Sequence, residues 1–197
     1  MSIEVLHLIC FGHRPGGPAD FCLHKEHGVK LTYLKLWGIH FRFVDLSSSS
    51  SLISVDLSSL DTLSVPCSVQ LPVSLRELTF IGGGLYDCVD FVEPFARLRH
   101  LTNLTFGPSS ATGGDDNLLC ISPRSTTNGL ICIPKLPCIL RCLRVVGPPS
   151  SIRVFDWQCL TECTSLEQLT LPHSYHLSGQ LEAWVKSVRH LRVDRFG

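Results

Sequence analysis

A short apolar phrase recurs along the chain at regular spacing, and this recurrence constrains the fold more than any other feature. The phrase has the form apolar-x-x-apolar-x-apolar, and an overlooked repeat would misassign the whole fold. Because 44% of the residues are hydrophobic, loose matches arise often by chance, and the strict form with leucine at the first two positions carries the weight. The strict form begins five times in phase, at Leu31, Leu75, Leu101, Leu140 and Leu166.

The spacing of the phrases supports a repeat independently of their composition. Eight phrases have their middle apolar residue at positions 6, 34, 55, 78, 104, 143, 169 and 191 of the 197 residues. The differences are 28, 21, 23, 26, 39, 26 and 22, and six of the seven lie in the range of about 20–29 residues typical of leucine-rich repeats. The longest interval contains 108–137, rich in Gly, Ser, Thr, Asp and Pro, which we predict to be a loop insertion.

On these phrases and this spacing, the chain resembles the leucine-rich repeat superfamily over nearly its full length. The resemblance implies an α/β solenoid, with a parallel concave sheet and with short helices and loops on the convex side. Leucines at positions 1, 4 and 6 of each phrase would face inward and stack on the next repeat, because a single repeat cannot bury its own apolar face. We therefore expect one domain, 1–197, of about 7–8 irregular repeats.

The repeats depart from the family pattern at the ninth position of the phrase, where the family has Asn or Cys. That position holds Phe11, Ile39, Leu60, Gly83, Ser109, Pro148, Ser174 and Phe196, so the asparagine ladder is absent. Between the phrases, apolar spacing predicts short helices over 92–98, 157–163 and 180–188. The serine run 47–51 is expected to be a turn.

The charge balance argues against a nucleic-acid partner. Lys+Arg and Asp+Glu number 17 each, so the net charge is zero and few counterions would be released on binding a phosphate backbone. No segment approaches the ~18–20 apolar residues needed to span a bilayer, and residues 1–12 lack the basic region of a secretory signal. We expect no membrane association and a cytoplasmic, or alternatively nuclear, location.

The ten cysteines are interpreted mainly as buried free thiols, with disulfides or a metal site as alternatives. Cys138 and Cys142, like Cys159 and Cys163, have a spacing that zinc sites permit. However, Cys142 falls on a repeat strand while Cys159 and Cys163 fall on a predicted helix, so the two pairs are not expected to converge. No cofactor is predicted.

A second group of possible metal ligands lies near the N-terminus. It comprises His13, Cys22, His24 and His27, around a Gly-Gly-Pro turn. These residue types are zinc ligands, so a metal-binding protein or enzyme that uses this group is the alternative to a purely structural role.

The most informative surface is the exposed face of the expected sheet. Side chains alternate along a strand, so positions 3, 5 and 7 of each phrase point outward. Tyr33 and Trp37 flank Lys35 there, and aromatic residues and arginine are the usual binding hot spots. The expected partner-binding residues are Tyr33, Lys35, Trp37, Asp56, Glu77, Arg144, His190 and Arg192.

These observations predict a protein–protein interaction module rather than an enzyme, because no catalytic motif is found. The resemblance suggests two settings: the recognition part of an F-box-type ubiquitin ligase adaptor, or of a plant-type immune receptor related to disease resistance. A truncated, non-functional repeat fragment is a further alternative.

Overall fold

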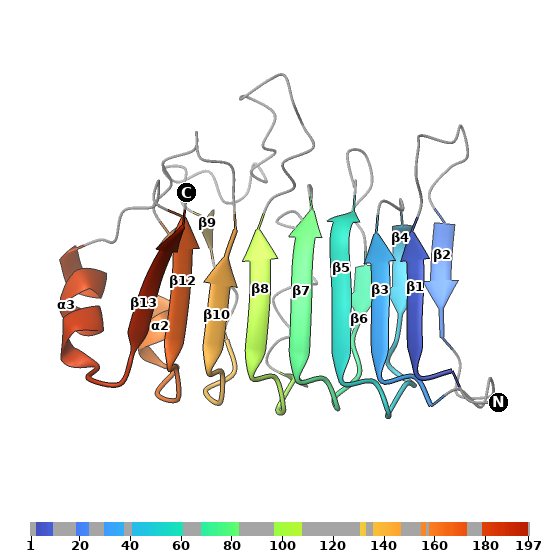
Figure 1. Cartoon of the computed structure of the whole chain (residues 1–197), viewed down its shortest axis with the longest axis horizontal. Coiled ribbons are helices and arrows are strands. Elements are labelled where there is room, and N and C mark those ends of the chain that lie inside the picture. The colour runs from blue at the N-terminus through green and yellow to red at the C-terminus, as the bar shows by residue number, and fades with distance from the viewer. Residues whose placement is uncertain are drawn as a thin grey trace, which may run out of the picture.

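The computed structural model describes residues 3–9, 19–23, 30–37, 41–60, 68–82, 97–107, 131–132, 136–146, 155–156, 158–172 and 179–196. They form a parallel β-solenoid that consists mostly of strands (Figure 1). One strand from each coil joins an eight-stranded parallel sheet. Its strands, in spatial order, are β1 (Val5–Ile9), β3 (Tyr33–Trp37), β5 (Ser54–Leu60), β7 (Glu77–Gly82), β8 (Asn103–Gly107), β10 (Cys142–Val145), β12 (Gln168–Pro172) and β13 (Arg192–Phe196).

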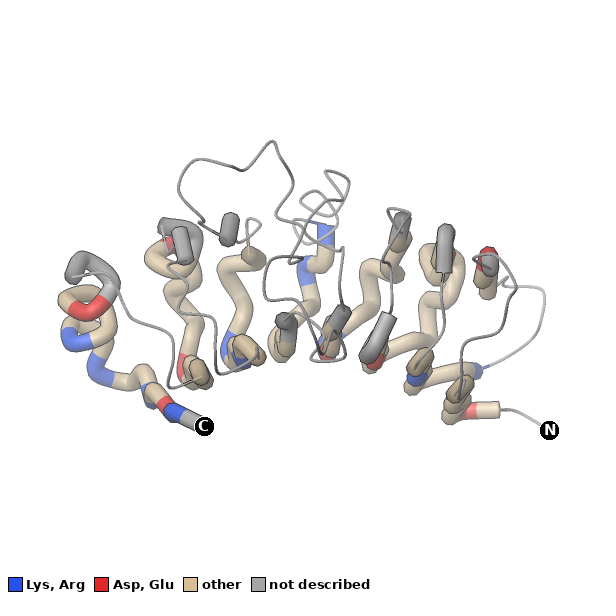
Figure 2. The backbone as a smooth tube through the Cα atoms, turned by 90° about the horizontal axis from the view of Figure 1, so that it is seen from above, with Lys and Arg blue, Asp and Glu red and all other residues tan. Residues whose placement is uncertain are grey.

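A second layer lies behind this sheet. In the N-terminal half it is a three-stranded parallel sheet of β2 (Ala19–Cys22), β4 (Phe41–Asp45) and β6 (Ser68–Gln70). Toward the C-terminus it contains the pair β9 (Ile131–Cys132) and β11 (Phe155–Asp156) and the helices α2 (Gln158–Thr161) and α3 (Gly179–Ser187). The strands follow a shallow arc, with the exposed face of the large sheet on its inner side (Figure 2). We call this surface the concave face.

The second layer corrects the expected α/β character. Short helices and loops were expected on the convex side, but the strands β2, β4 and β6 occupy that layer in the N-terminal half. The helix expected over 180–188 is confirmed as α3, and the helix expected over 157–163 is present in part as α2, which ends at Thr161 and leaves Cys163 beyond it. Most of 92–98 lies outside the described residues. Within the predicted insertion, Ile131–Cys132 is a strand paired with Phe155–Asp156, and the rest up to position 135 lies outside the described residues.

The sheet register confirms seven of the eight predicted phrase centres. Leu6, Leu34, Val55, Leu78, Leu104, Leu143 and Leu169 are partners of one another in successive strand pairs. The eighth centre is wrong: Leu169 pairs with Val193, two residues beyond the predicted Leu191. Alternation repeats every two residues, so a slip of two leaves the same side chains facing the core.

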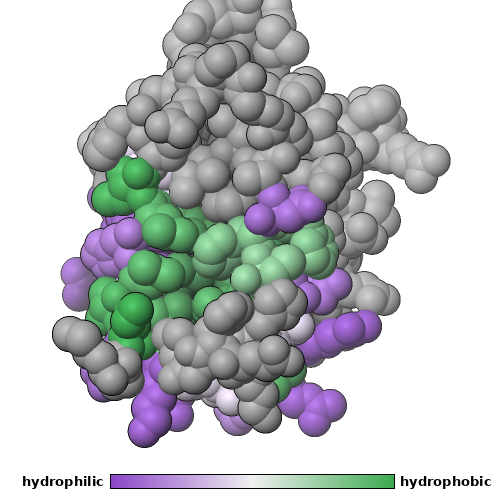
Figure 3. Space-filling view, turned by 90° about the vertical axis from the view of Figure 1, so that its right-hand side faces the viewer, coloured by the Kyte–Doolittle hydropathy of each residue, from purple (hydrophilic) through white to green (hydrophobic). Residues whose placement is uncertain are grey.

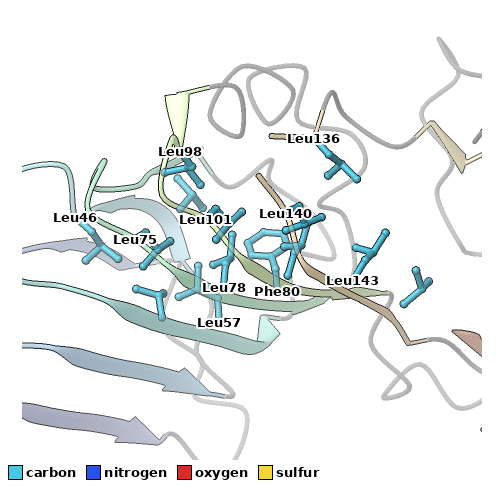
Figure 4. Packing of buried hydrophobic residues seen from close by; sticks show 14 of the residues in the cluster. Leu46, Leu57, Leu75, Leu78, Phe80, Leu98, Leu101, Leu136, Leu140 and Leu143 are labelled. Atoms are coloured by element: carbon cyan, nitrogen blue, oxygen red, sulfur yellow. The ribbon is translucent and has the colours of Figure 1, made fainter. Parts of the chain in front are cut away.

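The phrase leucines form the core of the solenoid. Along β3 the side chains of Leu34 and Leu36 are fully buried while their neighbours are half-buried, as alternation requires. Phrase leucines from successive coils stack into one continuous cluster between the two layers (Figure 4). Val44 and Val69, which are register partners on β4 and β6, close this cluster from behind.

Five coils turn into their strands through the same hydrogen bond. The first leucine of the phrase donates its backbone N–H to the carbonyl three residues earlier, which is the bond of a β-turn. The bond recurs at Leu52, Leu75, Leu101, Leu140 and Leu166, with N–O distances of 3.1–3.2 Å. The same leucines are at most 1% exposed, so this residue both ends the turn and begins the core.

One carbonyl per coil binds two amides of the next coil. The Ile53 carbonyl accepts from the N–H groups of Arg76 and Glu77 at 2.8 and 3.1 Å. The same pattern recurs on the carbonyls of Glu4, Thr32, Arg76, Thr102 and Arg141. These bonds fix the register of each coil against its predecessor.

Hydroxyl groups link neighbouring coils at the same turns. Ser51 Oγ donates to the Leu31 carbonyl at 3.0 Å, and Ser74 Oγ, one coil later, donates to the Leu52 carbonyl at 2.8 Å. Thr32 and Thr102 add hydroxyl donors to the preceding coil in the same way. In this chain without an asparagine ladder, serine and threonine supply side-chain bonds between coils.

Removing these hydroxyls should destabilise the fold measurably. Ser51→Ala and Ser74→Ala are each expected to lower the free energy of unfolding by about 0.5–1.5 kcal/mol, the net worth of one hydrogen bond. Urea denaturation measures the loss, with Ser50→Ala at an exposed position of the same turn as the control. Equal stability of all three variants would contradict a linking role for the two hydroxyls.

The two ends of the solenoid differ. At the C-terminal end Trp184 and Val185 of α3 pack against the core cluster. At the N-terminal end apolar side chains gather on the surface formed by β1 and β2 (Figure 3). Among the described residues, neither helix has the length and apolar character needed to cross a bilayer.

Candidate functional site

The concave face carries the residues that were expected to point outward. Tyr33, Lys35 and Trp37 on β3 are half-buried and alternate with two fully buried leucines. Asp56 lies on β5, Glu77 on β7, Arg144 on β10 and Arg192 on β13, all in the same sheet. These seven side chains therefore lie on one continuous surface, which the expected strand periodicity correctly predicted.

An ion pair links the neighbouring strands β3 and β5 in the N-terminal part of this face. Lys35 and Asp56 are register partners, and Lys35 Nζ lies 3.0 Å from Asp56 Oδ2. Ser58 donates its hydroxyl to Asp56 Oδ1 from two residues along the same strand. The side chains of Lys35 and Asp56 are 30% and 16% exposed, so the pair is largely covered but still reaches solvent.

Aromatic rings flank the ion pair. The rings of Tyr33 and His7 lie 5.3 Å apart at an interplanar angle of 55°, a tilted arrangement typical of attractive ring pairs. Trp37 lies two residues beyond Lys35 on the same face, opposite Ile9 on β1 and Ser58 on β5. We call Tyr33, Lys35, Trp37 and Asp56 the N-terminal patch.

The ion pair raises the pKa of Lys35. The hydrogen bond to Asp56 and the attraction of its charge raise the pKa of Lys35, although partial burial acts in the opposite direction. A raised folded pKa means that this contribution to stability is complete below the ordinary lysine value of 10.5. It is lost as the pH rises through the higher folded value.

A double-mutant cycle measures the worth of this pair. Lys35→Met, Asp56→Asn and the double variant are expected to give a coupling energy of about 0.2–1 kcal/mol, the range for pairs that reach solvent. The coupling should weaken as salt is added and disappear above the folded pKa of Lys35. Urea denaturation at several pH values provides the readout, and a coupling that is independent of pH and salt would count against the pair.

Small polar residues lie between the patch and the far end of the face. Glu77 is exposed and accepts a hydrogen bond from Asn103 Nδ2 at 3.3 Å. Thr79 and Thr105, register partners on β7 and β8, continue this polar strip. The centre of the face therefore offers carboxylate, amide and hydroxyl groups.

A second polar group lies at the C-terminal end. Asp194 Oδ1 accepts from Arg192 Nε at 2.9 Å, and its Oδ2 accepts from Gln168 Nε2 at 2.9 Å. The hydrogen bond from Gln168, and to a smaller extent the one from Arg192, lowers the pKa of Asp194. We call Arg144, Gln168, Arg192 and Asp194 the C-terminal patch.

The structure corrects one residue of the expected set and adds two. His190 was expected on the concave face but lies in the turn before β13, because the last strand is in register two residues later than predicted. Gln168 and Asp194 were not selected from the sequence, although both occupy outward positions, because their bond becomes evident only with the true register. Arg192 is consequently paired with a carboxylate, so this end is less basic than its sequence indicates.

Four of the ten cysteines have side chains that the structure describes, and all four are free thiols. Cys163 is buried and donates to the Pro137 carbonyl of the preceding coil at an Sγ–O distance of 3.7 Å. Burial, with the nearby Cys138 and Glu162, raises its pKa to about 11. The expectation of burial is confirmed for Cys163, is wrong for Cys22 and Cys138, which are exposed, and holds in part for Cys142, where burial raises the pKa.

The group of possible metal ligands near the N-terminus remains an alternative hypothesis. Cys22 lies exposed on β2, whereas His13, His24 and His27 lie outside the described residues. Within the part of the chain that the structure describes, no three His, Cys, Asp or Glu side chains are grouped to hold a metal ion.

Comparisons with known proteins add no family name. No protein-family model, curated protein or solved structure matches this chain.

Proposed function

We propose that the chain is a non-enzymatic protein-binding module of the leucine-rich repeat type that takes a protein partner on its concave face. The observation that carries the proposal is the N-terminal patch, where Tyr33 and Trp37 flank a largely covered ion pair. Tyr and Trp are enriched among interface hot spots, which lie where an interface is well packed. The pair limits the motion of Lys35, so less side-chain entropy is lost on binding.

The two patches suggest different contributions to such an interface. The N-terminal patch supplies aromatic area, while the C-terminal patch supplies charged and amide groups at the other end. From β3 to β10 there are four strand spacings, about 19 Å at the usual separation of neighbouring strands. A partner that contacts both patches must therefore cover the polar strip between them.

The resemblance of the phrases suggests the setting. We propose the recognition part of an F-box-type ubiquitin ligase adaptor or of a plant-type immune receptor, acting in the cytoplasm without nucleic acid, membrane or cofactor. Both settings use a repeat surface to bind protein and require no chemistry from it. The phrases and spacing of the sequence are the support for this narrower proposal.

Binding measurements with matched variants test the proposal. A partner is captured with the full chain by cross-linking and identified by mass spectrometry, and its dissociation constant is then measured by calorimetry with purified proteins. Tyr33→Ala/Trp37→Ala should weaken binding about 30-fold or more, the effect of losing one strong hot spot. Arg144→Ala/Arg192→Ala should have a smaller effect that diminishes with salt.

The control variant changes residues away from the concave face. Gln70→Ala/Val73→Ala removes exposed side chains of β6 and of the turn that follows it, and should bind like the wild type. If both concave-face variants also bind like the wild type, the concave face is not the binding surface.

A further inference from the structure

The N-terminal end of the solenoid exposes an unusual amount of apolar surface. Ile3, Val5 and Ile9 are 52%, 56% and 46% exposed; Val5 and Ile9 are the first and last residues of β1, and Ile3 precedes it. In the space-filling view of this end, apolar side chains form a patch over β1 and β2 (Figure 3). Contiguous apolar patches on soluble proteins usually mark contact surfaces.

The core is also incompletely covered at this end. Leu34 and Leu36 on β3 are fully buried, whereas their register partners Leu6 and Leu8 on β1 are only partly buried. The difference arises because β3 has a strand on both sides and β1 has a neighbour on one side among the described residues. One further strand against β1 would give Leu6 and Leu8 the environment of the inner leucines.

The outer edge of β1, which pairs with no strand among the described residues, presents hydrogen-bonding groups in a defined order. The Glu4 carbonyl accepts from Thr32 and Tyr33, so the even-numbered residues of β1 bond to β3. In a parallel strand successive residues alternate between the two sides, so Val5, His7 and Ile9 direct their backbone groups away from the sheet. Those three residues also place their side chains on the concave face.

We propose that two copies of this chain associate edge to edge through β1, antiparallel and centred on His7. The strand reads Val-Leu-His-Leu-Ile, which has the same kinds of side chain in either direction. In this register Val5 of one copy stands opposite Ile9 of the other, Leu6 opposite Leu8, and His7 opposite His7. The outward amides and carbonyls of both strands then form about six hydrogen bonds, as in any antiparallel pair.

The charges on the two end strands favour pairing of β1 with β1 of a second copy over pairing of β1 with β13. β13 carries Arg192, Asp194 and Arg195, and a copy added there in the sheet register would set Leu8 against Arg195. Between Val5 and Ile9, His7 is the one titratable side chain of β1, so two such strands meet without a fixed charge. The association is isologous and therefore closes at two copies.

The dimer would enlarge the surface described above. The two concave faces join into one, with the two β3 strands three strand spacings apart, about 14 Å. Two N-terminal patches then lie side by side at the centre of a continuous sheet. A partner with two like epitopes would bind both patches at once and gain from the second contact.

Charge substitutions on the edge strand test both the association and its register. Sedimentation of the full chain over a range of concentrations should show a monomer–dimer equilibrium. Val5→Lys/Ile9→Lys and Val5→Glu/Ile9→Glu place like charges opposite each other and should be monomeric, but should form a one-to-one dimer when mixed. Val5→Lys/Ile9→Glu places unlike charges opposite each other and should dimerise by itself.

Matched controls separate this result from a folding defect. Ile53→Lys/Val73→Lys replaces two exposed apolar residues elsewhere and should remain dimeric. Circular dichroism should show the same strand content in all variants, since neither Val5 nor Ile9 is part of the buried core. The proposal is overturned by a wild type that is monomeric throughout, by an open series of oligomers, or by a Val5→Lys/Ile9→Glu variant that is monomeric. A monomeric wild type would remove the gain from a second patch, whereas binding to a single concave face is tested separately by the Tyr33→Ala/Trp37→Ala variant.

Discussion

Replacing Leu78 with alanine should lower the free energy of unfolding by about 2–5 kcal/mol. Leu78 is 2% exposed near the start of β7, between its register partners Val55 and Leu104. Its truncation leaves a cavity between the preceding and the following coil. Because both coils are held by their own neighbours, Val55 and Leu104 cannot move to fill the cavity. Urea denaturation measures the loss, and the change in midpoint should be large for a domain of this size.

Leu6→Ala provides the matched control. Leu6 occupies the same position of the first phrase but is only partly buried, so its truncation should cost well below the cost at Leu78. Both substitutions are best made in the Val5→Lys/Ile9→Lys background, where association through β1 does not contribute. Equal losses at the two positions would contradict a core that is complete in the middle and incomplete at this end.

A proline at Thr79 should disrupt the sheet. Thr79 lies inside β7, with Asp56 of β5 on one side and Thr105 of β8 on the other. Every amide of such an interior strand serves one neighbour or the other, so proline leaves a carbonyl without its donor, at a cost of about 1–3 kcal/mol. The ring also clashes with the adjacent strand, and proline is essentially confined to sheet edges for this reason.

His7→Pro is the corresponding change on the edge strand. The His7 amide points away from β3, so its loss removes no bond of the eight-stranded sheet. In the monomeric Val5→Lys/Ile9→Lys background, thermal unfolding followed by circular dichroism should show a large decrease in midpoint for Thr79→Pro and a small one for His7→Pro. A similar decrease in both would mean that β1 is not an edge strand.

The sequence predicted the large sheet well because one signal is repeated in it many times. A phrase centre that recurs at 34, 55, 78 and 104 determines which residues are neighbours across strands, and the pairing of Lys35 with Asp56 follows from that register alone. The error at the last strand has a physical cause. Moving the strand by two residues preserves the alternation of Val193 with its neighbours, so periodicity does not distinguish the two registers.

The second layer was not predictable in the same way. Phe21, Val44 and Val69 are aligned across β2, β4 and β6, but no repeated sequence phrase predicts these strands. Short apolar segments of this length are compatible with helix or strand until the space behind the sheet is known. Gln168 and Asp194 were missed for a related reason, because their hydrogen bond depends on the position of the final strand.

The carbonyl that accepts two amides from the following coil also bears on how such a chain changes length during evolution. The carbonyls of Thr32, Ile53 and Arg76 make this contact in the same way, so the junctions between these coils are chemically alike. Removing or duplicating one whole coil, from one such residue to the next, would bring two matching junctions together with every donor still supplied. Whole coils, most of them 21–28 residues long, are therefore the units by which this architecture can lengthen or shorten. An insertion or deletion of one or two residues within a turn changes the local turn conformation instead.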